Sequence, residues 1–192
     1  MGHDPRVSRK IQLLTLILAA GCTAGEPGPD ATAKLSALGS SGVSGTIDFT
    51  VLADGEVRID ADIKGLTPGM HAMHVHEWGD CSAADGMSAG GHFNPNMVDH
   101  GAPNSGTHHP GDYGNLEADA SGHAVLSLTV GAGTFTITEG DKLNILGRGV
   151  IVHEKLDDFG QPTGNAGGRL ACGVINVAGG TSPPVVNPTP GA

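Results

Sequence analysis

The chain has 192 residues, enough for one domain of about 150 residues with tails. Its 20 acidic and 10 basic side chains give a formal net charge of −10, which argues against nucleic acid and against an anionic membrane surface as partners. The 32 glycines and the aromatic content of only 3% favour a turn-rich β protein with a core of small aliphatic side chains.

Residues 1–22 have the features of an export signal. Three basic residues precede the apolar run 11–20, which is too short to span a bilayer. The run ends in LAAGC, similar to the bacterial lipoprotein signal, in which the cysteine, here Cys22, is acylated and becomes the new N-terminus. The alternative is an ordinary signal peptide cleaved near Ala24. Both predict export to the cell envelope or periplasm, and the first predicts a membrane contact only through lipid on Cys22.

Three parts are expected after the export signal. Residues 23–32, rich in Gly, Pro, Glu and Asp, predict a flexible tether. Residues 33–178 predict a single folded domain. Residues 179–192, rich in Pro and Gly, predict a disordered tail. We expect neither the tether nor the tail to carry chemistry.

Alternating apolar and β-branched residues predict strands along the domain, and Asp54-Gly55 predicts a hairpin between two of them. In chain order the expected strands are 33–38, 43–52, 56–63, 71–77, 122–130, 142–152 and 170–177. Two long loops, 79–115 and 154–168, separate the later strands. The pattern is typical of an all-β, antiparallel, eight-stranded Greek-key barrel or immunoglobulin-like sandwich with two long functional loops.

Seven of the ten histidines lie between His71 and Asp112. His74 and His76 are two residues apart in an expected strand, so both imidazoles point to one face and can reach one ion. His92, His100 and His109 follow at loop spacings, and Asp112 adds a carboxylate. Three histidines with one aspartate suit tetrahedral zinc, and an all-histidine set suits copper(II). Metal ligands would also restrain the long loop 79–115.

The chain has three cysteines, an odd number for an exported protein. If Cys22 carries lipid, Cys81 and Cys172 remain as one pair in an oxidising compartment. This pair predicts a disulfide that ties the first long loop to the last strand.

Five segments resemble, in order, the copper/zinc superoxide dismutase family: GLTPGMHAMHVHEWGD, GGHFNP, HHPGDYGNL, GRGVIVHEKLDDFG and TGNAGGRLACGVI. The resemblance covers about residues 34–177. The position of Cys81 between His76 and His92 is similar to the bacterial, exported branch. The dimer contacts of the animal and plant branch therefore do not carry over, although a homodimer remains compatible with the sequence.

The resemblance implies two metal ions and a small set of supporting residues. Copper would be held by His74, His76, His92 and His153, and zinc by His92, His100, His109 and Asp112, with His92 bridging the two ions. Asp157 matches a carboxylate that hydrogen-bonds one histidine of each metal. Arg169 matches a cation beside the open copper position, where its guanidinium suits a small anion. Three further histidines, His71, His108 and His123, are expected to be solvated surface residues.

The function implied by the resemblance is dismutation of superoxide to dioxygen and hydrogen peroxide. Copper is alternately reduced and reoxidised, His92 supplies a proton, and zinc, which is not redox-active, orients His92. One alternative is a non-enzymatic protein of the same fold that binds or delivers copper or zinc. A second is a zinc hydrolase, which needs three ligands and an open water position. In loop 154–168 the only cation is Lys155, so the lysines that draw superoxide in many relatives have no clear match.

Overall fold

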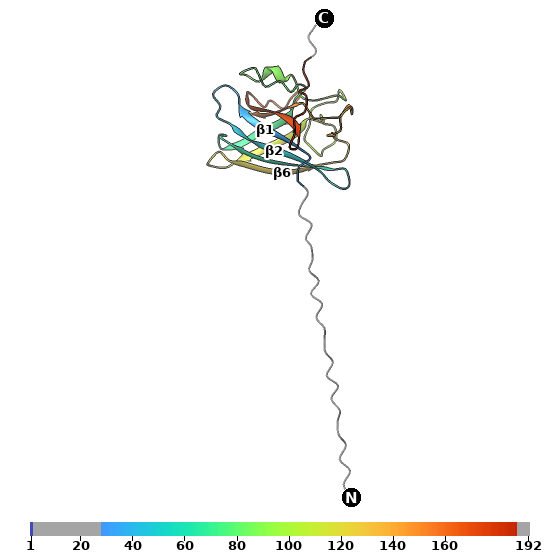
Figure 1. Ribbon diagram of the computed structural model, residues 1–192. Coiled ribbons are helices and arrows are strands. Elements are labelled where there is room, and N and C mark those ends of the chain that lie inside the picture. Colours follow the sequence, from blue (N-terminus) through green and yellow to red (C-terminus); the bar gives the residue numbers. More distant parts are fainter. Residues whose placement is uncertain (2–27, 188–192) are drawn as a thin grey trace.

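The computed structural model describes Met1 and residues 28–187, and the strands in this part of the chain form a closed antiparallel barrel (Figure 1). The eight strands are β1 Ala31–Ala37, β2 Ser44–Val51, β3 Val57–Lys64, β4 Gly69–Val75, β5 Asp112–Ala118, β6 Ala124–Val130, β7 Gly149–His153 and β8 Arg169–Val177. A single 3-10 turn, η1 Met87–Ala89, interrupts the first long loop. The expected all-β, eight-stranded fold is confirmed.

The strand order around the barrel is β1-β2-β3-β6-β5-β4-β7-β8, and every paired neighbour is antiparallel. The chain crosses from β3 to β4 without pairing them, because β3 pairs with β6 and β4 lies between β5 and β7. These crossovers define a Greek key. They also bring β4 and β7, which are far apart in the sequence, side by side.

The core follows from alternation along the strands. In β3, the side chains of Val57, Ile59, Ala61 and Ile63 are at most 3% exposed, and the residues between them are more exposed. Each strand contributes an inward set of this kind to one continuous core, which also contains Phe49, Tyr113 and Phe135 in mutual ring contact. Hydrophobic burial therefore closes the barrel, and the chemistry-bearing loops lie outside this core.

Two strand predictions were wrong. No strand was expected at β5, whose first four residues belong to the expected loop 79–115, because DYGNLEA opens with an aspartate and contains Gly114 with φ 73°. The strand expected at 142–152 begins only at Gly149. Before it, the Asp141 and Asn144 side chains accept hydrogen bonds from backbone N–H groups two residues on, which favours turns over an extended chain.

The predicted disulfide between Cys81 and Cys172 is present, with Cα atoms 5.7 Å apart. It joins the first long loop to β8 across a sequence separation of 91 residues. In the chain-entropy account, a crosslink of this span stabilises the fold by about 4.6 kcal/mol. The loop that carries four of the ten histidines, His92, His100, His108 and His109, is thus attached to the barrel near its start.

The boundaries of the domain differ from those expected. Ala31 and Thr32 belong to β1, not to a tether, and Ala31 is fully buried. The described part of the tail, up to residue 187, makes defined contacts: Ser182 is only 8% exposed, and Val185 makes two backbone hydrogen bonds of 2.7 Å. The prediction of disorder from Gly179 onward therefore does not hold for these residues, because barrel edges offer their backbone groups partners.

Apart from Met1, the predicted export signal, with Cys22, lies outside the described residues. Among the residues that are described, no helix has the length and apolar character needed to cross a membrane.

Candidate metal centre

The histidines converge at one end of the barrel because strand pairing and loop pairing both direct them there. His74 lies in β4, His76 directly follows it, and His153 ends β7, the neighbour of β4. His92 lies in the long loop and forms an isolated antiparallel bridge with His76. The loop is held alongside by backbone bonds from Phe93 N–H to the Val75 carbonyl (2.8 Å) and from neighbouring groups.

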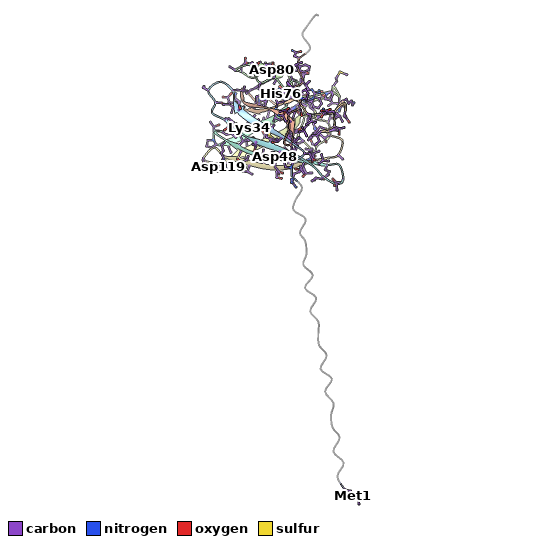
Figure 2. All side chains as sticks on the ribbon, viewed as in Figure 1. Met1, Lys34, Asp48, His76, Asp80 and Asp119 are labelled. Carbon is purple, nitrogen blue, oxygen red and sulfur yellow. A yellow bond between two sulfur atoms is a disulfide. The ribbon has the colours of Figure 1, made fainter. Side chains whose placement is uncertain are left out.

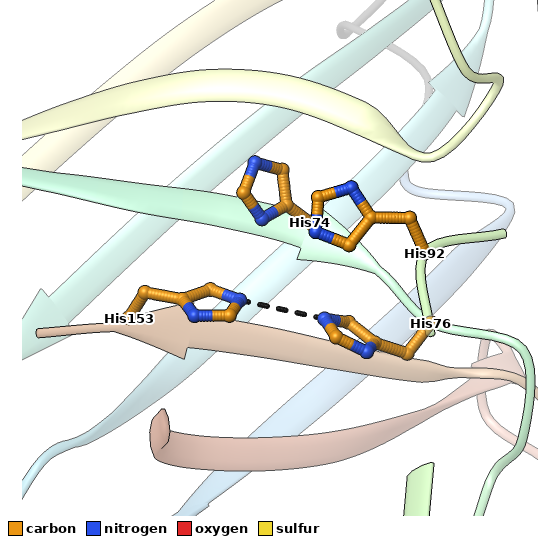
Figure 3. Close-up of side chains that lie close together, drawn as sticks. All are labelled: His74, His76, His92 and His153. Atoms are coloured by element: carbon orange, nitrogen blue, oxygen red, sulfur yellow. Dashed lines mark hydrogen bonds between the residues drawn. The ribbon is translucent and has the colours of Figure 1, made fainter. Parts of the chain in front are cut away.

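The first group of donors consists of His74, His76, His92 and His153, all buried. Figure 3 shows these rings facing one another, with His76 Nε2 and His153 Nε2 only 3.4 Å apart. Nitrogens bound at about 2.0 Å to one tetrahedral ion would lie about 3.3 Å apart. Nδ1 of His74 is buried without a hydrogen-bond partner, and such an atom is costly unless a cation or donor meets it. The donor set therefore fits a metal ion.

The second group contains His92, His100, His109 and Asp112, also buried. Asp112, the first residue of β5, has Oδ1 at 3.0 Å from His92 Nδ1 and at 3.1 Å from His109 Nδ1. Its Oδ2 lies 2.9 Å from His100 Nδ1, but this contact lacks hydrogen-bond geometry and leaves that nitrogen without a partner. A cation between these atoms would satisfy all four. Three imidazoles and one carboxylate are the donors of a closed zinc site.

His92 belongs to both groups. Because its Nδ1 faces Asp112, its Nε2 remains for the first group, and one imidazole can face two ions. The ring of His92 lies 4.0 Å from that of His74 and 5.5 Å from that of His109, centroid to centroid. No other residue is shared between these two groups in the described part of the chain.

Asp157 connects the groups by a second route. This buried carboxylate accepts hydrogen bonds from His74 Nε2 (2.8 Å) and from His100 Nε2 (2.9 Å). Both bonds leave Nδ1 of the same rings free to face a metal, so Asp157 fixes their tautomers and orientations. Gly164, at φ +76°, covers this carboxylate so closely that a Cβ atom there would collide with Asp157 Oδ1.

Burial makes most of the histidines of the first group neutral. Burial is the largest effect on three of these side chains, and it lowers the pKa of each. The pKa of His76 lies well below its usual value, that of His92 is about 4 and that of His153 is about 2. A neutral imidazole has a lone pair for a metal, whereas an imidazolium does not.

In the second group the carboxylates dominate. Burial lowers the pKa of His100, but its ion-pair contact with Asp112 and its hydrogen bond to Asp157 outweigh burial and raise the pKa to about 9. Burial raises the pKa values of Asp112 and Asp157, but their contacts with histidines outweigh burial. Both pKa values therefore lie well below the usual carboxyl range. Both carboxylates are therefore ionised and available to balance a bound cation, which would displace the proton of His100.

A cavity of about 820 Å³ opens on the first group and is lined by His76, His92, His153 and Arg169, among others. Arg169 is held in place because its guanidinium donates to the carbonyls of Gly86 and Gly90, both at 2.7 Å. Lys155 and Asp85 also line the cavity, so the charges at its mouth are mixed. The opening can admit a small anion to the histidines, with Arg169 beside it.

The prediction for His71 was wrong. Its side chain is only 1% exposed, with Nδ1 at 2.8 Å from the His153 carbonyl and Nε2 at 2.8 Å from the Thr67 carbonyl. His71 thus connects β4 to the end of β7. This contact depends on which strands are neighbours, and the residues around His71 in the sequence do not indicate it. His108 and His123 are partly exposed, the latter contacting Asp62 at 3.0 Å.

The fold and the site define a β-barrel protein with two adjacent donor sets for metal ions. Residues 43–175 match the family described as copper/zinc superoxide dismutase (SODC). The chain is 43% identical over 143 residues to the protein named "Extracellular superoxide dismutase [Cu-Zn]" of Drosophila melanogaster, which covers 70% of this chain and 76% of that protein. This chain belongs to the copper/zinc superoxide dismutase family.

A solved structure has a similar fold. The structure described as "Crystal Structure Analysis of the clock protein EA4" superposes with a TM-score of 0.69 at 40% sequence identity. The match covers 80% of this chain and 98% of that one.

We predict that Asp157→Asn weakens the binding of both metals by about 10- to 100-fold, because an amide can no longer accept a hydrogen bond from both histidines. Competition titrations with copper and zinc chelators measure this. The matched control is Asp158→Asn, since Asp158 is exposed and bonds only within its own loop, to Gly160 and Asn165. Equal effects of the two substitutions would show that Asp157 does not orient the metal ligands.

Proposed function

We propose that this protein catalyses the dismutation of superoxide to dioxygen and hydrogen peroxide. We assign copper to His74, His76, His92 and His153, and zinc to His92, His100, His109 and Asp112. The observation that carries the proposal is the sharing of His92 by two buried donor sets of different chemistry, one all-histidine and one with a carboxylate. Family membership supports the same assignment.

When bound, copper supplies a one-electron couple that can take an electron from one superoxide and return it to another, while zinc supplies a fixed positive charge. The protein contributes position and protons. Arg169 attracts the anion into the cavity and is held rigid by its two carbonyl partners. His92 can hold a proton on Nε2, the nitrogen turned toward the first group, and deliver it to the departing peroxide.

A non-enzymatic metal-binding or metal-delivery protein is the alternative. It would need the donor sets but neither an opening for substrate nor a fixed cation in that opening. Here Arg169 lines the cavity together with three of the four histidines of the first group, which favours the enzyme. A zinc hydrolase is disfavoured because the second group already offers four protein ligands, as in closed zinc sites.

We predict that His153→Ala removes copper binding and dismutation while zinc is retained, because His153 belongs only to the first group. Asp112→Ala should instead release zinc first, since Asp112 belongs only to the second. Metal content after titration and an assay of superoxide removal distinguish the two variants. Equal loss of both metals in both variants would show that the ligand sets are misassigned.

We predict that kcat/KM rises or stays constant as salt increases from about 10 to about 150 mM. The acidic side chains are spread widely, as Asp48, Asp80 and Asp119 illustrate in Figure 2, and the formal net charge of −10 repels superoxide at long range. Screening shortens this repulsion from about 30 Å to about 8 Å, whereas Arg169 acts locally. Pulse-radiolysis rates that fall several-fold over this range would contradict the prediction.

We also propose export, with residues 1–22 as the signal and Cys22 as the lipid attachment site of a protein of the bacterial envelope. The LAAGC motif supports the lipid, and the pairing of Cys81 with Cys172 leaves Cys22 unpaired. The name of the Drosophila relative supports export of this chain without indicating a lipid. A homodimer is compatible with the proposal, with no interface assigned.

We predict that Cys22→Ser releases the protein from the membrane, because two acyl chains are what would hold it there. Detergent phase partitioning measures the change, and Ser82→Ala, far from the signal, is the control. A wild-type protein that already enters the aqueous phase with its N-terminus cut elsewhere would contradict lipid attachment.

A further inference from the structure

The described end of the chain turns back onto the barrel after β8. The Ser182 N–H donates to Asn176 Oδ1 (2.8 Å), and the Val177 N–H donates to Ser182 Oγ (3.1 Å). Ser182 is buried by these contacts. The turn fixes the direction in which the following residues run.

After this turn, Val185 pairs with two separate segments. Its N–H donates to the Gly147 carbonyl and its own carbonyl accepts from the Gly79 N–H, both at 2.7 Å. Gly79 follows His76 in the first long loop, and Gly147 precedes β7. One residue that uses both backbone groups in this way resembles an added strand residue, the mode in which extended peptides bind exposed edges.

Two glycines allow this approach. A Cβ atom at Gly79 would collide with the Gly147 carbonyl and lie 3.2 Å from Pro184 Cβ. Gly147 has φ +77°, and a Cβ atom there would collide with the Pro183 carbonyl. The edge between them is therefore shaped for a backbone that lies directly against it.

Val185, half-buried, lines a hollow of about 230 Å³ together with Trp78, Phe93, Pro95 and Arg148 and with the polar residues Glu77 and Asn94. The Arg148 guanidinium covers the Phe93 ring at 3.8 Å and donates to the Glu77 carbonyl (2.7 Å). This hollow offers space with a mixed apolar and polar lining beside the two backbone bonds. The next side chain, Val186, points away and is 65% exposed.

We propose that Gly79, Gly147 and the hollow beside them form a recognition groove for an extended peptide with a small aliphatic side chain, and that residues 183–186 cover this groove as an intramolecular strap. Unpaired edge groups are templates for pairing with another chain, and proteins commonly cover them. While the strap is in place, the same segment of a second copy cannot use this edge. Opening the strap makes the groove a binding surface.

The test compares two substitutions in the full-length protein. Val185→Pro removes the N–H that bonds Gly147 and places a ring against that carbonyl, whereas Val186→Pro makes the same change one residue later, at a position that takes part in neither bond. The probe is a synthetic peptide of residues 181–187. Trp78, the only tryptophan of the chain, lines the hollow and reports binding by its fluorescence.

We expect the Val185→Pro protein to bind the peptide saturably, and the wild type and Val186→Pro to bind it at least tenfold more weakly. A peptide with proline at the position of Val185 should not bind. Comparable binding by all three proteins, or none by Val185→Pro, would overturn the proposal. Hydrogen exchange of the Gly79 N–H is an independent check on the wild type alone: it should be at least tenfold slower than in an unstructured chain, and an unprotected Gly79 would also overturn the proposal.

Discussion

The metal centre depends on one constraint: six histidines and two aspartates occupy the buried end of the barrel, and each must find a partner there. Burial alone opposes every charge in this region. The structure meets the constraint with two carboxylates, each serving several imidazoles, so that Asp112 contacts three histidines and Asp157 two. The remaining nitrogens, above all Nδ1 of His74, face the space where ions would lie.

The carboxylates also make the two groups of donors electrostatically different. Where no carboxylate contacts the ring, as at His76 and His153, burial lowers the pKa and leaves a neutral ligand. At His100, two carboxylates reverse the effect of burial. A redox-active ion therefore would be held by neutral imidazoles, and a structural dication by a site with its own negative charge, which is the distribution expected for copper and zinc.

Long loops carry this chemistry, and the barrel limits their freedom at several points. The disulfide attaches the first loop to β8, the Arg169 side chain attaches it through two carbonyls, and the strap contacts it at Gly79. These attachments come from the C-terminal part of the chain, from Arg169 onward. Residues near the end of the sequence thus help to position ligands that lie near its middle.

The sequence by itself determined the features that have a local pattern. Alternation predicted most strands, and the two-residue spacing of His74 and His76 placed both on one face. The five motifs implied the ligand sets, and the cysteine count predicted the disulfide. Only the tertiary structure decided the contacts between distant segments: the burial of His71 beneath the centre, the strand β5, and the pairing of Val185 with Gly79 and Gly147. Each of these depends on which strands are neighbours in the Greek key, and strand order leaves no periodic signal in the residues themselves.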